Sequence, residues 1–183
     1  FALGHDVAGV VVRVGARVKN FKAGDEVYAS PDDFQVGTFA EYVPVNESSL
    51  AIKPKNISME EAASLPLVAL TAWQILVERA KIRAGQKVFI QAGSGGVGTI
   101  AIQLAKHLGA KVATTTSTAN VNWVKSLGAD VVVDYKQADF EEVLNGYDVV
   151  LNSQDSTTLG KSFNVLKSGG QVISISGPPD AGF

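Results

Sequence analysis

The sequence lacks cysteine altogether and has only two histidines among its 183 residues. Without cysteine it can form neither a disulfide bond nor a thiolate metal site. No stretch of the sequence approaches the ~18 consecutive apolar residues of a transmembrane helix. The net charge of −2 supplies no clustered basic field of the kind that nucleic-acid binding requires. We therefore expect a globular protein with neither a membrane nor a nucleic acid as partner.

The chain also lacks the signals of a natural start. Phe1 is not an initiating methionine, and residues 1–6 have neither the charged start nor the long apolar region of a signal peptide. We expect a cytoplasmic protein on this basis. A strand pattern begins within the first few residues, and the chain stops soon after a strong strand pattern at 171–176. We therefore expect that both ends are missing from a longer protein.

The richest signal in the sequence is the stretch from Gln91 to Gly98, between an apolar run at 87–90 and a helical pattern at 99–106. Glycines at 93, 95 and 98 fit the dinucleotide-binding spacing G-x-G-x-x-G. The first permits a sharp turn, the second lets the backbone approach a pyrophosphate, and the third lets helix and strand pack closely. The following helix N-terminus adds unpaired N–H groups and about half a positive charge. The loop has no lysine, which disfavours a nucleoside triphosphatase.

The glycine spacing alone also fits a glycine-rich turn without a ligand, so the surrounding pattern decides. Strand and helix patterns alternate from residue 87 to the C-terminus, with Gly109 and Gly128 ending helices and Gly169-Gly170 forming a turn. The predicted strands are 87–91, 111–115, 131–134, 148–151 and 171–176, and the predicted helices are 97–108, 119–127, 139–144 and 157–167. These strands are too apolar for a sheet with a wet face, which predicts an α/β fold with a doubly wound parallel Rossmann sheet.

Residues 1–57 show a different pattern, with short β-rich runs and no helix. We predict strands at 6–14, 26–29, 38–45 and 50–53, which suggest part of a β-barrel or curled sheet. Ser58 then begins an Ala/Leu-rich segment that runs to about Lys81. Pro66 should split this segment into two helices that meet near Leu65. We expect a partial β-domain at 1–57, connecting helices at 58–84 and a dinucleotide-binding domain at 85–183.

The choice of coenzyme is expected at the end of the second strand of the dinucleotide domain. NAD-binding versions of this fold place an Asp or Glu there, about 20 residues after the glycines, to bind the ribose 2′-hydroxyl. The segment 111–129 contains neither acid, and its strand ends in Thr114, Thr115, Thr116, Ser117 and Thr118. A carboxylate near a 2′-phosphate would be repelled by about 4 kcal/mol at an effective dielectric near 20. NADP(H) is therefore favoured, although Thr116 and Ser117 also suit the alternative role of capping the next helix.

Five motifs in chain order resemble the medium-chain dehydrogenase/reductase superfamily, and most closely its zinc-independent, quinone oxidoreductase-like branch. They are Gly4-His5-Asp6-Val7-Ala8-Gly9, Gly24-Asp25-Glu26-Val27, Gly37-Thr38-Phe39-Ala40-Glu41-Tyr42, Leu70-Thr71-Ala72-Trp73 and Ala92-Gly93-Ser94-Gly95-Gly96-Val97-Gly98. The resemblance implies a truncated GroES-like β-domain followed by a Rossmann domain, with the active site in the cleft between them.

The resemblance also implies roles for individual residues. The pyrophosphate would lie on Gly93, Ser94, Gly95, Gly96, Val97 and Gly98. Thr71 would lie near the nicotinamide, and Ser117 and Tyr135 match positions that hold the 2′-phosphate in NADPH-using relatives. Asn120 stands where those relatives often carry a phosphate-pairing lysine, which weakens the expected phosphate grip; Lys125 is a possible replacement. Fold position alone adds the residues that end the fourth and fifth strands, namely Asn152, Ser153, Ser176 and Gly177.

Zinc can be judged from the residues themselves. A catalytic zinc takes three protein ligands, commonly cysteine or histidine, and this sequence offers only His5 and His107. No metal site is therefore expected from this chain, although His5 stands where a zinc-ligating histidine occurs in alcohol dehydrogenases. No catalytic acid can be named; Tyr28 and Tyr42 are candidates only by residue type.

We therefore predict an NADPH-dependent oxidoreductase that transfers a hydride to a small-molecule quinone or α,β-unsaturated carbonyl without zinc, as a homodimer in the full-length protein. Three alternatives stay open. The first is an alcohol dehydrogenase whose zinc ligands lie outside this segment. The second is a non-catalytic, crystallin-like NADPH-binding protein. The third is an enoyl reductase module cut from a larger synthase.

Overall fold

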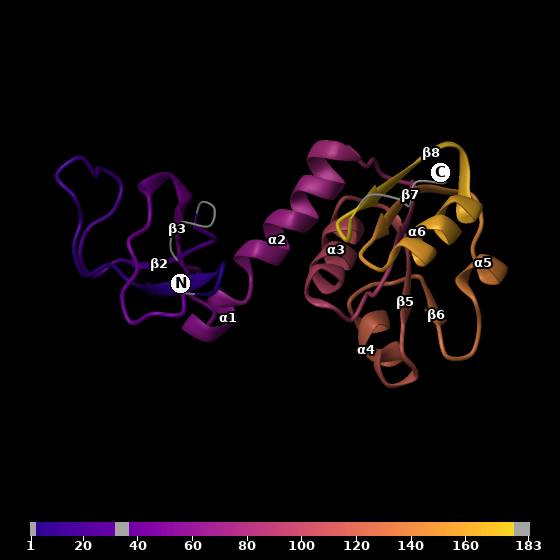
Figure 1. Ribbon diagram of the computed structural model, residues 1–183, viewed down its shortest axis with the longest axis horizontal. Helices are drawn as coiled ribbons and strands as arrows, with labels where there is room; N and C mark the ends of the chain where they lie inside the picture. Colours follow the sequence, from indigo (N-terminus) through magenta and orange to yellow (C-terminus); the bar gives the residue numbers. More distant parts are fainter. Residues whose placement is uncertain (1–2, 32–36, 178–183) are drawn as a thin grey trace. The chain divides into compact units, whose positions relative to one another are not determined.

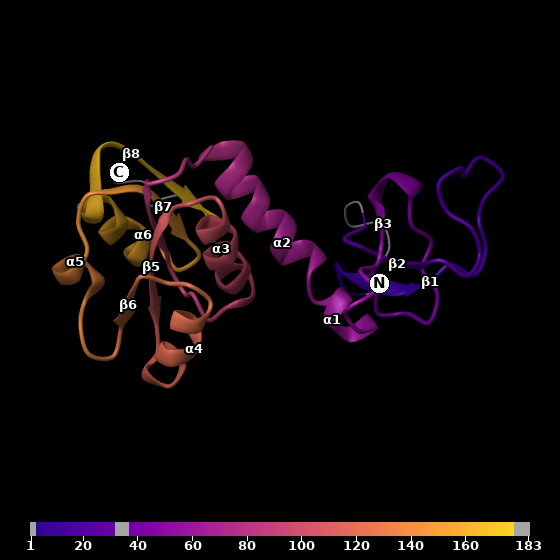
Figure 2. The ribbon, with the colours of Figure 1, turned by 180° about the vertical axis from the view of Figure 1, so that it is seen from behind.

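A computed structural model describes residues 3–31 and 37–177 of the chain. The chain divides into two compact units, residues 1–70 and 71–183, which are shown in Figure 1 and from behind in Figure 2. The boundary between the units falls inside the segment 58–84 that the sequence predicts as connecting helices. No helix in the described part of the chain combines the length and the apolar character needed to cross a bilayer.

The second unit is built on a five-stranded parallel sheet in the order β6-β5-β4-β7-β8. The strands are β4 (Lys87–Ile90), β5 (Lys111–Thr116), β6 (Val131–Asp134), β7 (Tyr147–Asn152) and β8 (Leu166–Ser174). The helices are α3 (Gly96–His107), α4 (Val121–Ser126), α5 (Phe140–Val143) and α6 (Ser156–Ser162), with short 3-10 turns at Thr118–Asn120 and Phe163–Val165. The sheet order reverses direction at β4, which is the arrangement of a Rossmann fold. The predicted fold class is confirmed.

Alternate residues of each strand supply the two faces of this sheet. In β4, Val88 and Ile90 pack with α3 and α4 in one apolar cluster, whereas Phe89 packs on the other face with Phe140 of α5 and with Val165. All five of these side chains are buried. Because both faces are covered, the strands carry apolar residues at successive positions, as parallel sheets require. Figure 1 shows α3 and α4 on one side of the sheet and α5 and α6 on the other.

The first unit contains a three-stranded antiparallel sheet in the order β1-β2-β3. Its strands are β1 (Val7–Val10), β2 (Glu26–Ala29) and β3 (Leu50–Ile52), with a 3-10 turn at Glu47–Ser49. The helix α1 (Met59–Ala63) follows, then α2 (Pro66–Trp73), which continues as a π-helical segment at Gln74–Arg79. Ser58 and Glu61 form a reciprocal capping box at the start of α1. Because α1 ends at Ala63 and α2 begins at Pro66, the predicted break between two helices near Leu65 is confirmed.

One strand prediction in this unit is wrong in part, and another is wrong altogether. The strand predicted at 6–14 spans only Val7–Val10, and Val11 makes one further pair of bonds, from its N–H to the carbonyl of Asp25 (2.9 Å) and from the N–H of Gly24 to its carbonyl (2.8 Å). The strand predicted at 38–45 is absent, since this segment pairs with no strand among the described residues. The sequence Pro31-Asp32-Asp33 should break the chain after β2, and it lies mostly outside the described residues.

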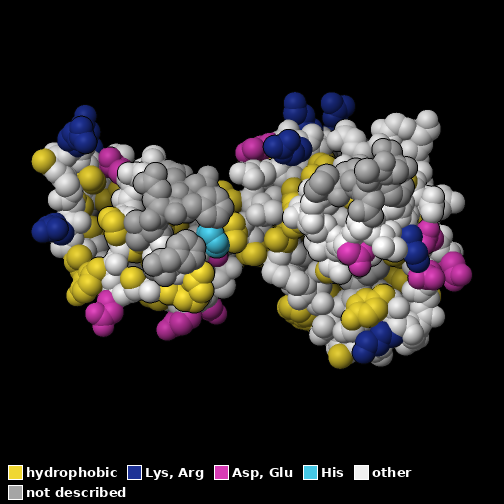
Figure 3. Space-filling view, in the orientation of Figure 1, with side chains coloured by type: hydrophobic (Ala, Val, Ile, Leu, Met, Phe, Trp, Pro, Cys, Tyr) yellow, Lys and Arg dark blue, Asp and Glu magenta, His cyan; other side chains and the backbone are white. Residues whose placement is uncertain are grey.

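The first unit exposes several large apolar side chains. The exposed fraction reaches 77% for Phe39, 74% for Tyr42 and 64% for Val12. Figure 3 shows hydrophobic side chains gathered on this unit, and acidic and basic side chains scattered over both units on the face in view. Both clusters of buried apolar side chains lie in the second unit, so hydrophobic burial stabilises the described part of the first unit less than it stabilises the second.

Candidate nucleotide-binding site

Residues 91–95, here called the glycine loop, connect the carboxyl end of β4 to the start of α3. The N–H of Gly93 donates to the carbonyl of Thr115 (2.9 Å), and the N–H of Ala92 donates to the Thr115 hydroxyl (3.0 Å). Ala92 has a φ of +51°, a left-handed conformation that costs a non-glycine residue roughly 1–2 kcal/mol. The two bonds to β5 hold the backbone in this turn. The loop is thus a fixed feature at the carboxyl edge of the sheet, where this fold binds its ligands.

The three motif glycines differ in their surroundings. A Cβ on Gly93 would come within 2.9 Å of Thr114 and Ile102 side-chain atoms, and one on Gly98 would come within 2.8 Å of the Gly93 Cα. Both residues are buried. A Cβ on Gly95 would meet only the carbonyl oxygen of Ala92, at 3.3 Å, and Gly95 is exposed. The first and third glycines are therefore required by packing, while the second leaves the backbone open to a ligand.

The N-terminus of α3 presents donors beside this open backbone. Gly95 is the N-cap and has no side chain to accept from the first turn. Within the described residues, no hydrogen bond engages the N–H groups of Gly96, Val97 or Gly98. These groups carry the partial positive charge of a 12-residue helix. The glycine loop and the helix N-terminus together fit a diphosphate.

Hydroxyl groups line the adjoining end of β5. The Thr116 hydroxyl donates to the Ser94 hydroxyl of the glycine loop (3.0 Å), and the Asn120 amide donates to the Ser117 hydroxyl (3.4 Å). Ser117 precedes the 3-10 turn Thr118–Asn120, but its side chain caps no backbone N–H of that turn. The structure therefore gives no support to the capping alternative for Ser117. Lys125 is exposed on α4.

The end of β6 adds an acid that the sequence reasoning missed. Asp134 lies opposite Thr116 in the register of β5 and β6. Its carboxylate accepts hydrogen bonds from the Thr118 hydroxyl (2.6 Å), the Gln137 amide (2.8 Å) and the N–H of Lys136 (3.0 Å). The bond from Thr118 is the main reason that the pKa of Asp134 lies below its ordinary value. Asp134 precedes Tyr135 in the sequence, and this neighbour was the available clue to its place in the site. The contacts of both residues with the loop after β5 depend on the register of β5 and β6.

Tyr135 follows Asp134 directly and is 61% exposed. Its N–H donates to the carbonyl of Thr116 (3.1 Å). Tyr135 and Ser117 thus lie in the two neighbouring loops that follow β6 and β5. The structure brings together the loops that carry both residues predicted to hold a 2′-phosphate.

The residues predicted at the ends of β7 and β8 form a network of their own. Asn152 is fully buried, and its amide donates to the Ser174 hydroxyl (3.1 Å), the Ser176 hydroxyl (3.1 Å) and the carbonyl of Gln154 (3.2 Å). Ser176 also donates to that carbonyl. Gly177 is exposed, with a φ of +128°. This network joins the carboxyl ends of two strands, and contact of these residues with a ligand stays a prediction.

A second group that the sequence reasoning missed surrounds Gln91, the last residue before the loop turns. Gln91 is buried, and its amide donates to the Ser162 hydroxyl of α6 (2.8 Å). The hydroxyl of Ser153 donates to the Gln91 carbonyl (3.3 Å), and the Gln91 side-chain oxygen has no protein partner among the described residues. Gln91 therefore ties the base of the loop to the end of β7 and to α6. A buried glutamine inside an apolar strand pattern was the available signal.

The remaining predicted residues lie elsewhere. Thr71 lies on α2, and its place near the nicotinamide stays a prediction. Tyr28 lies on β2, and Tyr42 is largely exposed. His5 and His107 are both exposed. Within the described residues, no group of three or more His, Asp or Glu side chains is placed to hold a metal ion.

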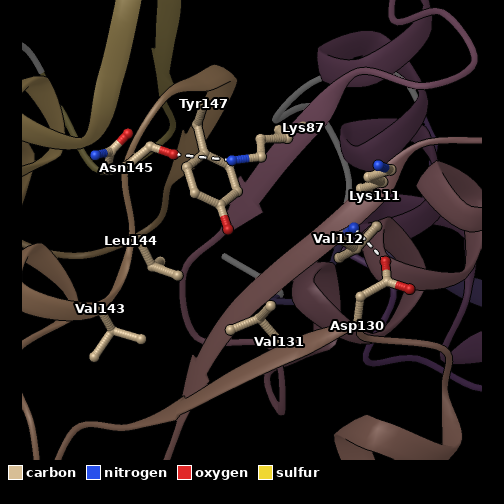
Figure 4. A pocket seen from close by; sticks show the side chains of 9 residues that line it. All are labelled: Lys87, Lys111, Val112, Asp130, Val131, Val143, Leu144, Asn145 and Tyr147. Atoms are coloured by element: carbon tan, nitrogen blue, oxygen red, sulfur yellow. Dashed lines mark hydrogen bonds between the residues drawn. The ribbon is translucent and has the colours of Figure 1, made fainter.

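The pocket in Figure 4 lies at the end of the sheet opposite the glycine loop. Its volume is about 500 Å³, and it lies at the amino-terminal starts of the strands, with Lys87 and Tyr147 among its lining residues. The Lys87 Nζ lies 5.2 Å from the centre of the Tyr147 ring and donates to the carbonyl of Asn145 (3.1 Å). The glycine loop follows the carboxyl end of β4, so this pocket is no part of the candidate nucleotide site.

Comparison with known families supports the fold of both units. Residues 1–55 match the alcohol dehydrogenase GroES-like domain, and residues 96–182 match the zinc-binding dehydrogenase family. Among solved structures, a quinone oxidoreductase from Coxiella burnetii superposes with a TM-score of 0.89 at 36% identity, over 94% of this chain and 55% of that chain.

Two plant proteins are similar in sequence. The 2-methylene-furan-3-one reductase of Solanum lycopersicum and the chloroplastic NADPH-dependent alkenal/one oxidoreductase of Arabidopsis thaliana are each 45% identical over 182 residues, which is 95% of this chain. This chain spans about half the length of these relatives, 46% in each case. The matched domains, these relatives and the superposed structure agree with the motifs seen in the sequence, and the chain therefore belongs to the medium-chain dehydrogenase/reductase superfamily.

Proposed function

We propose that the full-length protein is an NADPH-dependent oxidoreductase that reduces a quinone or an α,β-unsaturated carbonyl without zinc. The observation that carries this proposal is the open glycine loop at the N-terminus of α3, next to the hydroxyl-lined end of β5. The names of both plant relatives specify reduction of such carbonyl compounds, and one specifies NADPH. The superposed quinone oxidoreductase extends the class to quinones.

Individual residues would have separate roles in binding the coenzyme. The diphosphate of the coenzyme would be held by the backbone of Gly93 to Gly98, and the 2′-phosphate by Ser117 and Tyr135, with Asn120 beside them. Thr71 would lie near the nicotinamide, and Asn152, Ser176 and Gly177 would border the site. Bound NADPH supplies a hydride. The protein's part is to align the acceptor carbon, exclude water and place hydrogen-bond donors at the carbonyl oxygen, where negative charge develops.

The proposal also covers the organisation of the protein. We expect a β-domain at 1–57, connecting helices at 58–84 and a Rossmann domain at 85–183. We further expect a cytoplasmic homodimer. Light scattering of the full-length protein measures the oligomeric state, and fractionation of the cells that produce it measures the location.

The test is oxidation of NADPH and of NADH by the full-length protein, with a quinone and an enone as acceptors. We expect turnover with NADPH at a kcat/KM at least about tenfold above that with NADH, which is a difference of about 1.4 kcal/mol. Turnover should survive dialysis against a chelator, and metal analysis should find no stoichiometric zinc. Zinc-dependent turnover would favour the alcohol dehydrogenase alternative, and tight NADPH binding without turnover would favour a non-catalytic protein. Failure to bind either coenzyme would overturn the proposal.

A further inference from the structure

Asp134 links the two loops that carry the residues assigned to the 2′-phosphate. It is the last residue of β6 and lies opposite Thr116, the last residue of β5. One carboxylate oxygen accepts from the Thr118 hydroxyl at 2.6 Å, across to the loop after β5. The other accepts from the N–H of Lys136 at 3.0 Å, in the loop after β6. A single side chain is therefore bonded to both loops.

Ser117 is bracketed by these cross-strand bonds. On one side, the carbonyl of Thr116 accepts from the N–H of Tyr135 (3.1 Å). On the other side, the hydroxyl of Thr118 donates to Asp134. The residue between them has its backbone held from both directions. The backbone of Tyr135 is also held on both sides. Asp134 precedes it, and the N–H of Lys136, which follows it, donates to the Asp134 carboxylate.

The negative charge of Asp134 is stabilised by the hydrogen bonds that its carboxylate accepts. The carboxylate accepts three hydrogen bonds, including one from the Gln137 amide at 2.8 Å. The Thr118 bond is the largest of the contributions that lower the pKa of Asp134, so the group is ionised and acceptor-only near neutral pH. A carboxylate whose acceptor sites are filled by the protein has less capacity to bind a ribose hydroxyl, which is the role of the acid in NAD-binding versions of this fold.

We propose that Asp134 is a positioning residue for coenzyme selectivity, which fixes Ser117 through Thr118 and Tyr135 through its own backbone, so that both side chains meet a 2′-phosphate. This inference rests on the proposed function, because it presupposes NADP(H) binding. In this role the carboxylate favours NADPH binding, whereas simple charge repulsion would oppose it. Removing the carboxylate should weaken NADPH binding, whereas an acid that only repels phosphate would strengthen NADPH binding when it is removed.

The test measures the dissociation constants of NADPH and NADH for the full-length protein by titration calorimetry. In Asp134→Asn only one of the two oxygens remains, so the side chain cannot accept from the Thr118 hydroxyl and from the N–H of Lys136 at the same time. We expect the Kd for NADPH to rise about tenfold, in line with the loss of a charge-assisted hydrogen bond. The Kd for NADH should change less than about twofold, because NADH has no 2′-phosphate to place.

Thr118 supplies the matched pair of variants. Thr118→Val keeps the shape and removes the hydroxyl, so it should reproduce the selective loss of NADPH affinity, whereas Thr118→Ser keeps the hydroxyl and should restore it. The double variant Asp134→Asn with Thr118→Val should lose less NADPH affinity than the sum of the two single losses, since the two side chains share one interaction. Asp148→Asn is the control. Asp148 also accepts from a backbone N–H, that of Lys87 (2.8 Å), but it lies at the amino-terminal end of the strands. The Asp148→Asn variant should therefore leave the ratio of the Kd for NADPH to the Kd for NADH unchanged.

The outcomes separate this inference from the function on which it rests. If the unaltered protein binds neither coenzyme, the proposed function fails and the inference falls with it. If the unaltered protein binds NADPH but Asp134→Asn binds it as tightly or more tightly, the function stands and the positioning role is overturned. Equal losses for NADPH and NADH would also overturn it, because they would reveal general damage to the fold.

Discussion

Gly95 and Gly98 belong to the same glycine motif, yet their surroundings predict different consequences for substitution. Gly98→Ala should place a Cβ within 2.8 Å of the Gly93 backbone. We expect a loss of about 1–3 kcal/mol of stability, as for other overpacked sites. At Gly95 the nearest atom to a new Cβ is the Ala92 carbonyl oxygen, at 3.3 Å. Gly95→Ala should therefore cost less than about 1 kcal/mol, near the usual loss at an N-cap.

The two variants should consequently separate folding from coenzyme binding. Gly95→Ala should keep its melting temperature within a few degrees but lose roughly tenfold or more in NADPH affinity, because the methyl group occupies the path of the pyrophosphate. Thermal unfolding and calorimetric titration on the same samples measure both effects. A Gly95→Ala protein that binds NADPH as tightly as the original would show that the diphosphate does not approach this backbone.

At the level of single residues, the sequence predicted what local conformation requires and missed what strand register creates. Gly93 and Gly98 were predictable because a turn and a close approach exclude a Cβ. The contact between Asp134 and Thr118 depends on the alignment of β5 with β6, which no local pattern specifies. Asn152 was placed by its position at a strand end, but its full burial and its three donated bonds follow from the packing of β7 on β8.

At the level of elements, Lys53 joins the end of β3 to the start of α1. Its Nζ donates to the carbonyls of Pro54 (3.0 Å) and Ile57 (2.7 Å), and its side chain is only 5% exposed. Lys53→Met keeps the apolar stem and removes the donor, which leaves two carbonyls without that partner. We expect the free energy of unfolding to fall by about 1–3 kcal/mol, measured by urea denaturation. Lys55→Met, at a neighbouring exposed lysine, is the control and should change stability by less than about 0.5 kcal/mol.

The same scale shows why some strands were predicted correctly and others were not. β2 and β6 match their predicted limits of 26–29 and 131–134 because both have ladder partners in the structure. The segment 38–45 has an alternating pattern but no such partner among the described residues. Gly169 and Gly170 were predicted as a turn after the last helix, yet they lie within β8, where the register with β7 shifts between Tyr147 and Val149. Such an irregularity tolerates the φ of +74° at Gly169.

For the whole molecule, acid should destabilise the second unit through its aspartates. Burial alone would raise the pKa of Asp148, but the bonds from Lys167 and from the N–H of Lys87 outweigh it and leave this pKa below its ordinary value. The pKa of Asp130 is lowered similarly, against burial, by Lys106 and the N–H of Val112. A folded-state pKa below the unfolded value contributes stability above the unfolded pKa, and that stability is lost as pH falls through the folded pKa.

We therefore expect the melting temperature to be nearly constant from pH 7 to about pH 5 and to fall progressively below about pH 4. Asp148→Asn should lower stability at pH 7 and flatten the acid limb, since one of the groups that takes up a proton on unfolding has been removed. Melting followed by circular dichroism at each pH measures both. An acid limb of unchanged slope in Asp148→Asn would contradict a role for this carboxylate.

The two units should also differ in their resistance to local opening. The apolar clusters of buried side chains lie in the second unit, with β4, β5 and β7 at their centre. The first unit exposes several large apolar side chains, among them Phe39 and Tyr42. Amide exchange protection reflects the free energy of the opening that frees each N–H, and this free energy rises with the apolar contacts that the opening breaks.

Native-state hydrogen exchange on the 183-residue chain should therefore show the slowest amides in β4 and β7, at Val88 to Ile90 and Val149 to Leu151. We expect the paired amides of β1 and β2 to exchange at least about a hundredfold faster, a difference of about 2.7 kcal/mol in opening free energy. Mass spectrometry of peptic fragments resolves the two units within one sample, so each serves as the reference for the other. Protection of β1 and β2 equal to that of β4 and β7 would mean that the units unfold only together, and that the exposed apolar surface of the first unit does not limit its stability.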